Sequence, residues 1–234
     1  MTSTLIIPGL RSSGPAHWQS WFETQIVSTV RVIQPDWTTP DLNAWSARIR
    51  RDITRTPGRL YIVAHSFGAL AAVQAANNHA TRIAGALLVA PADPDKFGVS
   101  SLLPHDPLPF PTVVVGSTND PWMSLQKAAD WADGLGAEFV NLGAAGHINV
   151  DSGFGPWPEG LQLLERLRRT VARHDARERS AAARAVVKRR VRSRFDRHSE
   201  ERRTLQQAAA LLTTAGWRVL PPNRAETVVT QHRQ

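Results

Sequence analysis

The chain has 234 residues, of which 42% are hydrophobic, and it contains no cysteine. This length allows one large domain, or one domain with an appendage. The absence of cysteine excludes disulfides, thiolate catalysis and cysteine-ligated metal sites. The net charge of +8 is uneven, because residues 1–170 carry 13 Lys and Arg against 14 Asp and Glu, whereas residues 171–234 carry 15 against 6. The basic character therefore belongs to the C-terminal part and does not indicate nucleic-acid binding by the first 170 residues.

The N-terminal residues lead directly into the apolar run Leu5-Ile6-Ile7. They contain neither a basic region nor a long apolar stretch. We therefore expect no signal peptide, no transmembrane helix and a cytoplasmic protein.

Short apolar runs closed by turn residues predict a series of strands in the first 170 residues. The predicted strands are residues 4–7, 30–33, 60–63, 86–89, 112–115 and 138–142. Continuous apolar runs of this length are typical of strands that are buried on both faces. The helical patterns between and after them are residues 17–29, 42–54, 67–78, 125–135 and 158–173. This alternation predicts an α/β fold, a compact three-layer α/β/α sandwich with a mostly parallel sheet.

The C-terminal part has a different composition. We predict a catalytic domain over residues 1–173 and an Arg-rich extension over residues 174–234, which is either helical or disordered. The segment 216–221 hints at a small ordered element. The simplest interpretation is a solvated extension, and the alternative is electrostatic binding of nucleic acid or an anionic surface, which would weaken steeply with salt.

Ser66 lies between an apolar run and an Ala-rich helical run, in the segment Ala64-His65-Ser66-Phe67-Gly68. This is the pattern of a nucleophile elbow, in which a strand turns sharply into a helix and exposes a serine hydroxyl. The small residues at either end of the segment leave room for the turn. Such a pattern arises by chance in about one chain of this length in six, so the surrounding sequence has to decide its meaning.

A serine nucleophile needs a base within hydrogen-bond reach and an acid that orients the base. His147 is the best candidate base, because it lies on a small-residue loop after the last predicted strand of the sheet. Asp120 is the favoured acid, because it follows the strand before that histidine and the order Ser, Asp, His is typical of hydrolases with this architecture. Asp93 and Asp95, after the preceding strand, remain alternatives.

The oxyanion of an acyl-transfer reaction needs two backbone donors. We expect one from Phe67, directly after the candidate nucleophile, and one from Leu10, in the Gly/Ser-rich turn after the first strand. Trp122 and His17 are candidate pocket residues. His65 is expected to point to the other side of the elbow, as a buried, hydrogen-bonded structural residue.

Residues 91–111 form a proline-dense loop that leads away from a strand end. Loops of this length are usually functional or disordered. We interpret it as part of the pocket wall or a partial lid, with a plain surface loop as the alternative. Packing of helices against the sheet accounts for most of the tryptophans in residues 18–45.

Several segments together resemble the small serine hydrolases of the α/β-hydrolase superfamily that are grouped with retinoblastoma-binding protein nine and its bacterial relatives. They cover the chain up to about residue 170 and are Ile7-Pro8-Gly9-Leu10, Gly14-Pro15-Ala16-His17-Trp18, Gln34-Pro35-Asp36-Trp37, Ala64-His65-Ser66-Phe67-Gly68, Asn119-Asp120-Pro121 and Gly146-His147-Ile148-Asn149. The resemblance implies a triad of Ser66, Asp120 and His147 that acts on small ester-like substrates. A Leu-x-Cys-x-Glu motif cannot occur without cysteine, so no retinoblastoma-type partner is expected.

The sequence therefore predicts a serine hydrolase that cleaves small esters through an acyl-enzyme, without a metal or cofactor. The alternative is a protein that keeps the hydrolase fold and only binds ligands, since a fold does not establish catalysis.

Overall fold

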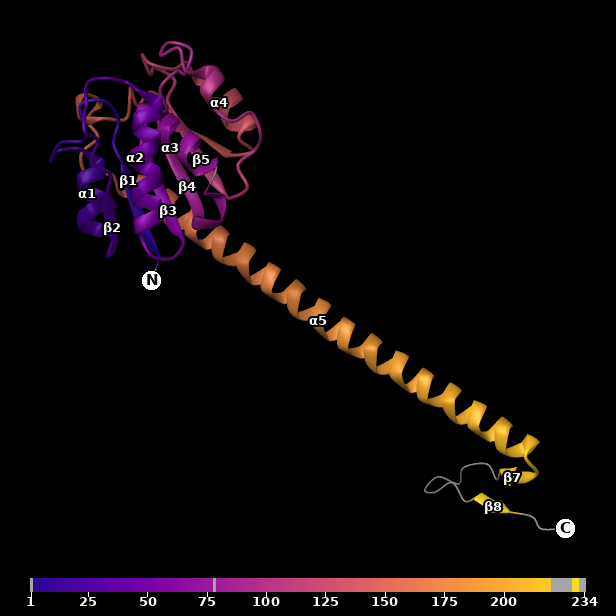
Figure 1. Cartoon of the computed structure of the whole chain (residues 1–234). Coiled ribbons are helices and arrows are strands. Elements are labelled where there is room, and N and C mark those ends of the chain that lie inside the picture. The colour runs from indigo at the N-terminus through magenta and orange to yellow at the C-terminus, as the bar shows by residue number, and fades with distance from the viewer. Residues whose placement is uncertain (1, 78, 220–228, 232–234) are drawn as a thin grey trace. The chain divides into compact units, whose positions relative to one another are not determined.

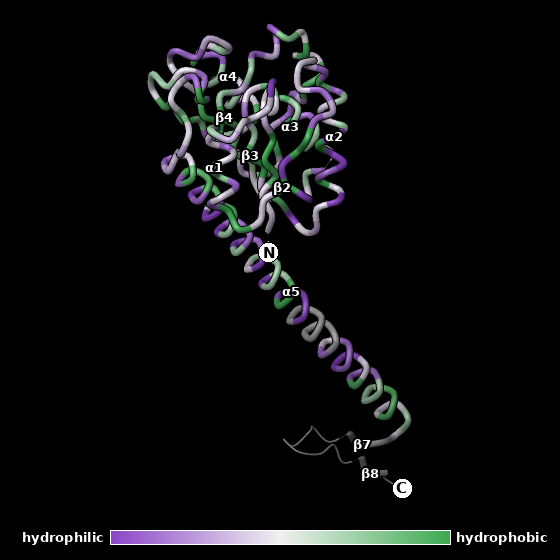
Figure 2. Tube along the Cα trace, turned by 90° about the vertical axis from the view of Figure 1, so that its left-hand side faces the viewer, coloured by the Kyte–Doolittle hydropathy of each residue, from purple (hydrophilic) through white to green (hydrophobic). Residues whose placement is uncertain are grey.

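The computed structural model describes residues 2–77, 79–219 and 229–231. Six parallel strands form one sheet in the order β2-β1-β3-β4-β5-β6 (Figure 1). The strands are β1 (Ser3–Ile7), β2 (Thr29–Arg31), β3 (Leu60–His65), β4 (Ile83–Val89), β5 (Thr112–Gly116) and β6 (Glu138–Asn141). The central strands β3, β4 and β5 are buried along their whole length, and Figure 2 shows β3 as hydrophobic chain inside the unit. The predicted parallel sheet is confirmed.

Helices cover both faces of this sheet and enclose two separate hydrophobic cores. The helices are α1 (Trp18–Gln25), α2 (Leu42–Arg55), α3 (Phe67–Asn77), α4 (Leu125–Gly134) and α5 (Pro158–Thr214). One core joins the sheet to α2, α3 and α4, and α2 and α3 lie side by side over that face (Figure 1). The other core joins the opposite face to α1 and the first turns of α5. This is the predicted three-layer α/β/α sandwich.

Single turns of 3₁₀-helix interrupt three of the connections. They are η1 (Ala80–Arg82), η2 (Ser100–Leu102) and η3 (Val150–Ser152). Two of them lie in segments that concern the site, η2 in the long loop after β4 and η3 three residues after the candidate base His147. Residue 78, the predicted end of α3, lies outside the described residues.

The first helix is shorter than the predicted range of 17–29. It ends at Gln25 because the backbone becomes extended at Ile26, where the chain turns toward the sheet. The amide of Thr4 then bonds to the carbonyl of Ser28, and β2 begins at the next residue. The pairing of β2 with β1 therefore overrides the helical pattern of residues 26–29.

The last helix is much longer than the predicted range of 158–173. Residues 161–215 contain no glycine and no proline, and alanine and arginine are among the strongest helix formers. The helix α5 therefore continues to Thr214, and Gly216 follows it in the left-handed conformation with φ of +83°. After it, β7 (Trp217–Val219) pairs antiparallel with β8 (Val229–Gln231). Residues 220 and 221 of the expected ordered element lie outside the described residues.

The chain divides into two compact units, residues 1–174 and residues 175–234. The first unit contains the six-stranded sheet with both of its cores, and the second contains the rest of α5 and the small β7–β8 sheet. No helix within the described ranges is long and apolar enough to cross a membrane.

Candidate active site

The candidate nucleophile Ser66 lies at the turn between β3 and α3. Its φ of +55° is in the left-handed region, which is costly for a residue with a side chain and is common at functional turns. Its amide donates to the carbonyl of Val89 over 3.1 Å, which ties the turn to the neighbouring strand. Close packing explains why the residue two positions after Ser66 is glycine, because a Cβ atom at Gly68 would collide with the carbonyl of Pro8. The chain can therefore make this turn only with a very small residue at position 68.

A chain of hydrogen bonds connects Ser66, His147 and Asp120. The Oγ atom of Ser66 lies 2.9 Å from Nε2 of His147, and Nδ1 of His147 lies 3.0 Å from both carboxylate oxygens of Asp120. A carboxylate only accepts hydrogen bonds, so Nδ1 carries the proton and Nε2 accepts from the serine hydroxyl. The side chains of His147 and Asp120 are 8% and 3% exposed, so water barely reaches this chain of bonds.

Asp120 owes its position to the loop that follows β5. One of its carboxylate oxygens accepts the amide of Trp122 over 2.8 Å, which closes a tight turn around Pro121. The two alternative acids do not contact His147 in this way. Asp93 and Asp95 both form ion pairs with Lys127, on α4. The structure therefore brings Asp120, and not Asp93 or Asp95, to the histidine.

Of the two expected oxyanion donors, Leu10 lies in the turn after β1 and Phe67 follows Ser66 directly. In the turn after β1, the amide of Arg11 donates to the carbonyl of Trp37 and the amide of Ser12 donates to the carbonyl of Gly9. Within the described part of the chain, the amides of Leu10 and Phe67 have no such partner and are free to donate to a ligand. Leu10 lines the cleft above Ser66.

Two further histidines lie beside His147, and burial keeps both of them neutral. Burial, Arg31 and His147 lower the pKa of His17 to about 4. Burial, with His147 and His17 nearby, holds the pKa of His65 well below its usual value. The buried, hydrogen-bonded state expected for His65 is confirmed, but its orientation away from the site is wrong. Its ring centroid lies 4.9 Å from that of His147, and it lines the cleft.

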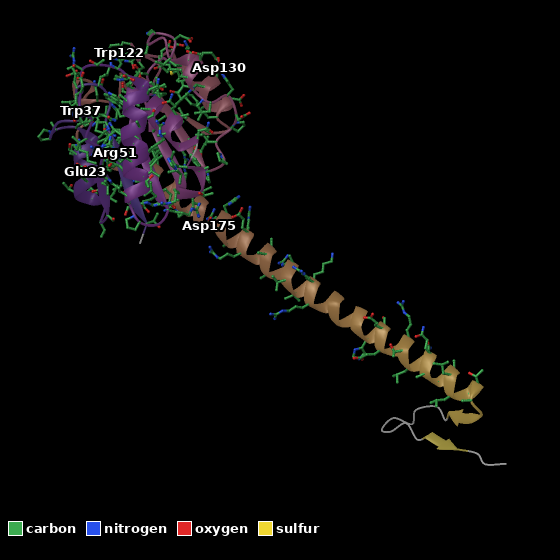
Figure 3. The ribbon with its side chains drawn as sticks, in the orientation of Figure 1. Glu23, Trp37, Arg51, Trp122, Asp130 and Asp175 are labelled. Carbon is green, nitrogen blue, oxygen red and sulfur yellow. The ribbon has the colours of Figure 1, made fainter. Side chains whose placement is uncertain are left out.

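Ser66, His147 and Leu10 line one cleft of about 500 Å³ at the carboxyl ends of the strands. Its lining residues come from six segments and are Leu10, Arg11, Ser12, Gly14, His17, Thr38, His65, Ser66, Phe97, Trp122, His147, Asn149, Val150 and Asp151. Both candidate pocket residues, His17 and Trp122, are among them, and Figure 3 shows Trp122 at the upper rim of the unit. Trp122 is 46% exposed, and its ring stacks on that of Phe97 at a centroid distance of 6.3 Å.

Phe97 is a lining residue that the sequence did not single out. It belongs to the proline-dense loop 91–111, and its ring also contacts Phe67, at 5.1 Å between centroids. Lys96, beside it, donates to the carbonyl of Pro121 over 3.0 Å and so attaches this loop to the Asp120 turn. Part of the loop therefore forms a wall of the cleft. In the sequence, only the length of the loop indicated this role, and nothing pointed to Phe97 itself.

The imidazoles of the cleft are engaged with the protein itself. His147 uses both ring nitrogens, and Nδ1 of His17 accepts the amide of Gln19 over 3.1 Å. The Nε2 atom of His65 lies 3.0 Å from the carbonyl oxygen of His147, to which it donates. These bonds suit a proton-transfer site whose histidines have fixed tautomers.

Comparisons with known proteins identify the family of this chain. The sequence model of the serine hydrolase family matches residues 4–166. A YdeN-like hydrolase from Pectobacterium atrosepticum is 38% identical, with a TM-score of 0.70 over 73% of this chain and 92% of that chain. The comparison with curated proteins gave no significant match.

More distant structures share the fold. The ydeN gene product from B. subtilis is 20% identical, with a TM-score of 0.61 over 71% of this chain and 98% of its own. Est1E from Butyrivibrio proteoclasticus, solved with ferulic acid, is 14% identical, with a TM-score of 0.55 over 75% of this chain and 90% of its own. Because the family match covers more than half of the chain and the first relative is 38% identical, the chain belongs to the serine hydrolase family, with an α/β-hydrolase fold.

Proposed function

We propose that this hydrolase cleaves small esters through a covalent acyl-enzyme on Ser66. The observation that carries the proposal is the continuous chain of hydrogen bonds from Ser66 through His147 to Asp120, at the base of an open cleft. A serine hydroxyl is a weak nucleophile at its own pKa and becomes effective when a base within reach accepts its proton.

In the first half of the reaction, Oγ of Ser66 attacks the ester carbonyl carbon while its proton moves to Nε2 of His147. The negative charge that develops on the carbonyl oxygen is stabilised by the amides of Leu10 and Phe67. His147 then donates the proton to the leaving alkoxide, the bond to the alcohol breaks, and the acyl group remains on Ser66. Asp120 holds the imidazole in the required tautomer and stabilises its positive charge.

In the second half, water replaces the alcohol. His147 accepts a proton from the water, whose oxygen attacks the acyl carbon, and the same two amides stabilise the second tetrahedral intermediate. Return of the proton to Oγ of Ser66 releases the carboxylic acid and restores the free enzyme. Every proton in this cycle passes through Nε2 of His147, so no metal or cofactor is needed.

Covalent labelling tests the proposal directly. The full-length protein is treated with a fluorophosphonate probe, and the modified peptide is located by mass spectrometry. We expect a single adduct on Ser66 and turnover of 4-nitrophenyl acetate that disappears as the adduct forms. Absence of labelling in the folded protein would contradict the proposal and favour a catalytically silent binding protein.

The contact between Gly9 and the candidate nucleophile predicts a sensitive position. A Cβ atom at Gly9 would lie 2.7 Å from Cβ and 3.3 Å from Oγ of Ser66. Gly9→Ala must therefore shift the donor turn or the serine, and we expect a loss in kcat of about 100-fold, since misplacement by about 1 Å has effects of that size.

The matched control is Gly14→Ala, in the same turn, where a Cβ atom would meet nothing within 4 Å. This variant should keep kcat within about twofold, as an unstrained surface change does. Steady-state hydrolysis of 4-nitrophenyl acetate by both variants, with circular dichroism to establish folding, makes the comparison. Equal kcat values for the two would contradict this assignment of the donor turn.

Removal of residues 175–234 is expected to leave catalysis unchanged. All cleft residues and both cores of the sheet belong to residues 1–174. We propose that the basic segment is a solvated extension, so the shortened chain should keep kcat/KM within about twofold of the full chain. A tenfold loss would show that the extension takes part in the reaction. A salt-sensitive gel shift seen only with the full chain would instead identify it as a nucleic-acid-binding segment.

A further inference from the structure

The loop that carries His147 has a strained backbone. Ile148, the next residue, has a φ of +49°, although β-branched residues are rarely found in the left-handed region. Ile148 is also completely buried, so the turn cannot relax toward solvent. Conformations of this kind persist only where the surrounding structure holds them in place.

Hydrogen bonds hold this loop on its amide side and on its carbonyl side. On the amide side, three side-chain oxygens accept hydrogen bonds from the N–H groups of three consecutive residues. These pairs are Ala145 with Ser117 Oγ at 3.0 Å, Gly146 with Asn119 Oδ1 at 2.7 Å and His147 with Ser152 Oγ at 3.1 Å. These acceptors lie on the Asp120 loop or within the histidine loop itself. They therefore fix the position of His147 relative to Asp120, but not relative to Ser66.

The carbonyl side is held by two buried side chains from elsewhere in the fold. The Nε2 atom of His65 donates to the carbonyl of His147 over 3.0 Å, and the indole Nε1 of Trp18 donates to the carbonyl of Ile148 over 2.9 Å. Trp18 is fully buried and His65 is 5% exposed, so neither bond competes with bulk water. Loss of either donor would leave a buried carbonyl unsatisfied.

Both donors are rigidly connected to the nucleophile. His65 precedes Ser66 directly at the end of β3. Trp18 begins α1, and the next residue, Gln19, donates through Nε2 to the carbonyl of Ile7 at 3.1 Å and to that of Val63 at 3.2 Å. These carbonyls lie at the ends of β1 and β3, the strands that lead into the Gly9 turn and the Ser66 turn. The first turn of α1 is therefore fixed to the same strand ends as the serine.

We infer that Trp18 and His65 are positioning residues, which hold two successive carbonyls of the histidine loop so that Nε2 of His147 stays within reach of Ser66. This inference rests on the proposed serine mechanism. It assigns a role to Trp18, the last residue of the Gly-Pro-Ala-His-Trp segment. Packing alone would explain an aromatic ring at this position, but not the indole N–H that bonds to the histidine loop. Neither residue exchanges a proton with the substrate, because both act through the backbone of the loop.

The chemistry of the two donors fits this role. The rings of His65 and His147 lie 4.9 Å apart, so a charged His65 would oppose the positive charge that His147 gains in each half-reaction. His65 remains neutral and still donates through Nε2, and the indole of Trp18 is a neutral donor with no acceptor function. The loop is thus held without any additional charge.

Replacing Trp18 by phenylalanine removes the indole donor and keeps an aromatic ring. We expect kcat for 4-nitrophenyl acetate to fall by about 10-fold to 100-fold while KM changes by less than about twofold, because the reacting atoms are misaligned and the cleft is not. The matched control is Trp157→Phe. Trp157 packs on Trp18 at 5.3 Å between ring centroids, is 3% exposed, and has no bond to the histidine loop.

A rescue pair tests His65 in the same way. His65→Gln keeps an N–H donor near the position of Nε2 without an ionisable ring, whereas His65→Leu removes the donor at similar volume. We expect His65→Leu to lower kcat by about 10-fold or more and His65→Gln to recover most of that loss. Thermal unfolding of all four variants identifies losses that arise from instability, and kcat is expressed per folded molecule.

The outcomes separate this inference from the proposed function. Equal kcat values for Trp18→Phe and Trp157→Phe, or for His65→Leu and His65→Gln, would overturn the positioning role while the wild-type protein still labels with the fluorophosphonate. If the wild-type protein does not label, the serine mechanism itself fails. A lower kcat in Trp18→Phe with unchanged KM, together with a lower kcat in His65→Leu that recovers in His65→Gln, supports the inference.

Discussion

Replacing Ser66 by alanine is expected to lower kcat for 4-nitrophenyl acetate by about 10⁴-fold to 10⁶-fold, which is the range seen when a triad serine is removed. The variant loses the oxygen that lies 2.9 Å from Nε2 of His147 and so loses the covalent route. KM should change little, because the walls of the cleft remain. Stopped assays over long incubation, with the uncatalysed rate subtracted, measure the residual turnover.

Ser12→Ala is the matched control for this prediction. Ser12 lines the same cleft and presents a hydroxyl, but its side chain is not hydrogen-bonded to His147. The control should retain kcat within a few-fold and keep its fluorophosphonate adduct, whereas Ser66→Ala should lose both. Labelling that survives in Ser66→Ala and disappears in Ser12→Ala would reassign the nucleophile.

Much of the fold was predictable because its signals are local. Continuous apolar runs mark strands that are buried on both faces, and small residues around Ser66 mark a turn whose backbone leaves no room for a Cβ atom at position 68. In a parallel sheet the carboxyl ends of all strands lie at one edge, so Ser66, Asp120 and His147 could be placed together from chain order alone. Distances and tautomers follow only from the folded chain.

Features that depend on distant partners were not predictable. Helix α1 ends early because β2 pairs with β1, and a pairing partner 25 residues away leaves no trace in local periodicity. His65 was expected to face away from the site, yet its bond to the carbonyl of His147 joins residues 82 positions apart. The length of α5 is a different case, since the run without glycine or proline is visible in the sequence but allows a long helix without requiring one.

The choice among three candidate acids shows how a non-local contact decides the site. Asp93 and Asp95 also follow a strand of the sheet, but Lys127 of α4 binds both of them. These two carboxylates are therefore engaged with a cation of α4, and Lys96 donates to the carbonyl of Pro121 in the Asp120 turn. Of the three carboxylates, that of Asp120 therefore accepts the hydrogen bond from Nδ1 of His147.

Asp120→Asn is therefore expected to lower kcat by about 10⁴-fold, as loss of the acid does in serine proteases of the triad type. The asparagine can keep the acceptor that binds the amide of Trp122, so the turn is preserved. Its amide nitrogen, however, can only donate toward Nδ1 of His147. The proton then moves to Nε2, which can no longer accept the hydroxyl proton of Ser66, and the chain of bonds runs in the wrong direction.

Asp93→Asn and Asp95→Asn are the matched controls, because they make the same chemical change in the two alternative acids. Both should retain kcat within about threefold and lose at most a little stability, since their ion pairs with Lys127 lie outside the chain of bonds and the exposed pair contributes little. Steady-state kinetics of the three variants, each checked for folding, decides the assignment. A loss in Asp93→Asn that equals or exceeds the loss in Asp120→Asn would transfer the role of the acid to Asp93, which in turn would require a different orientation of His147.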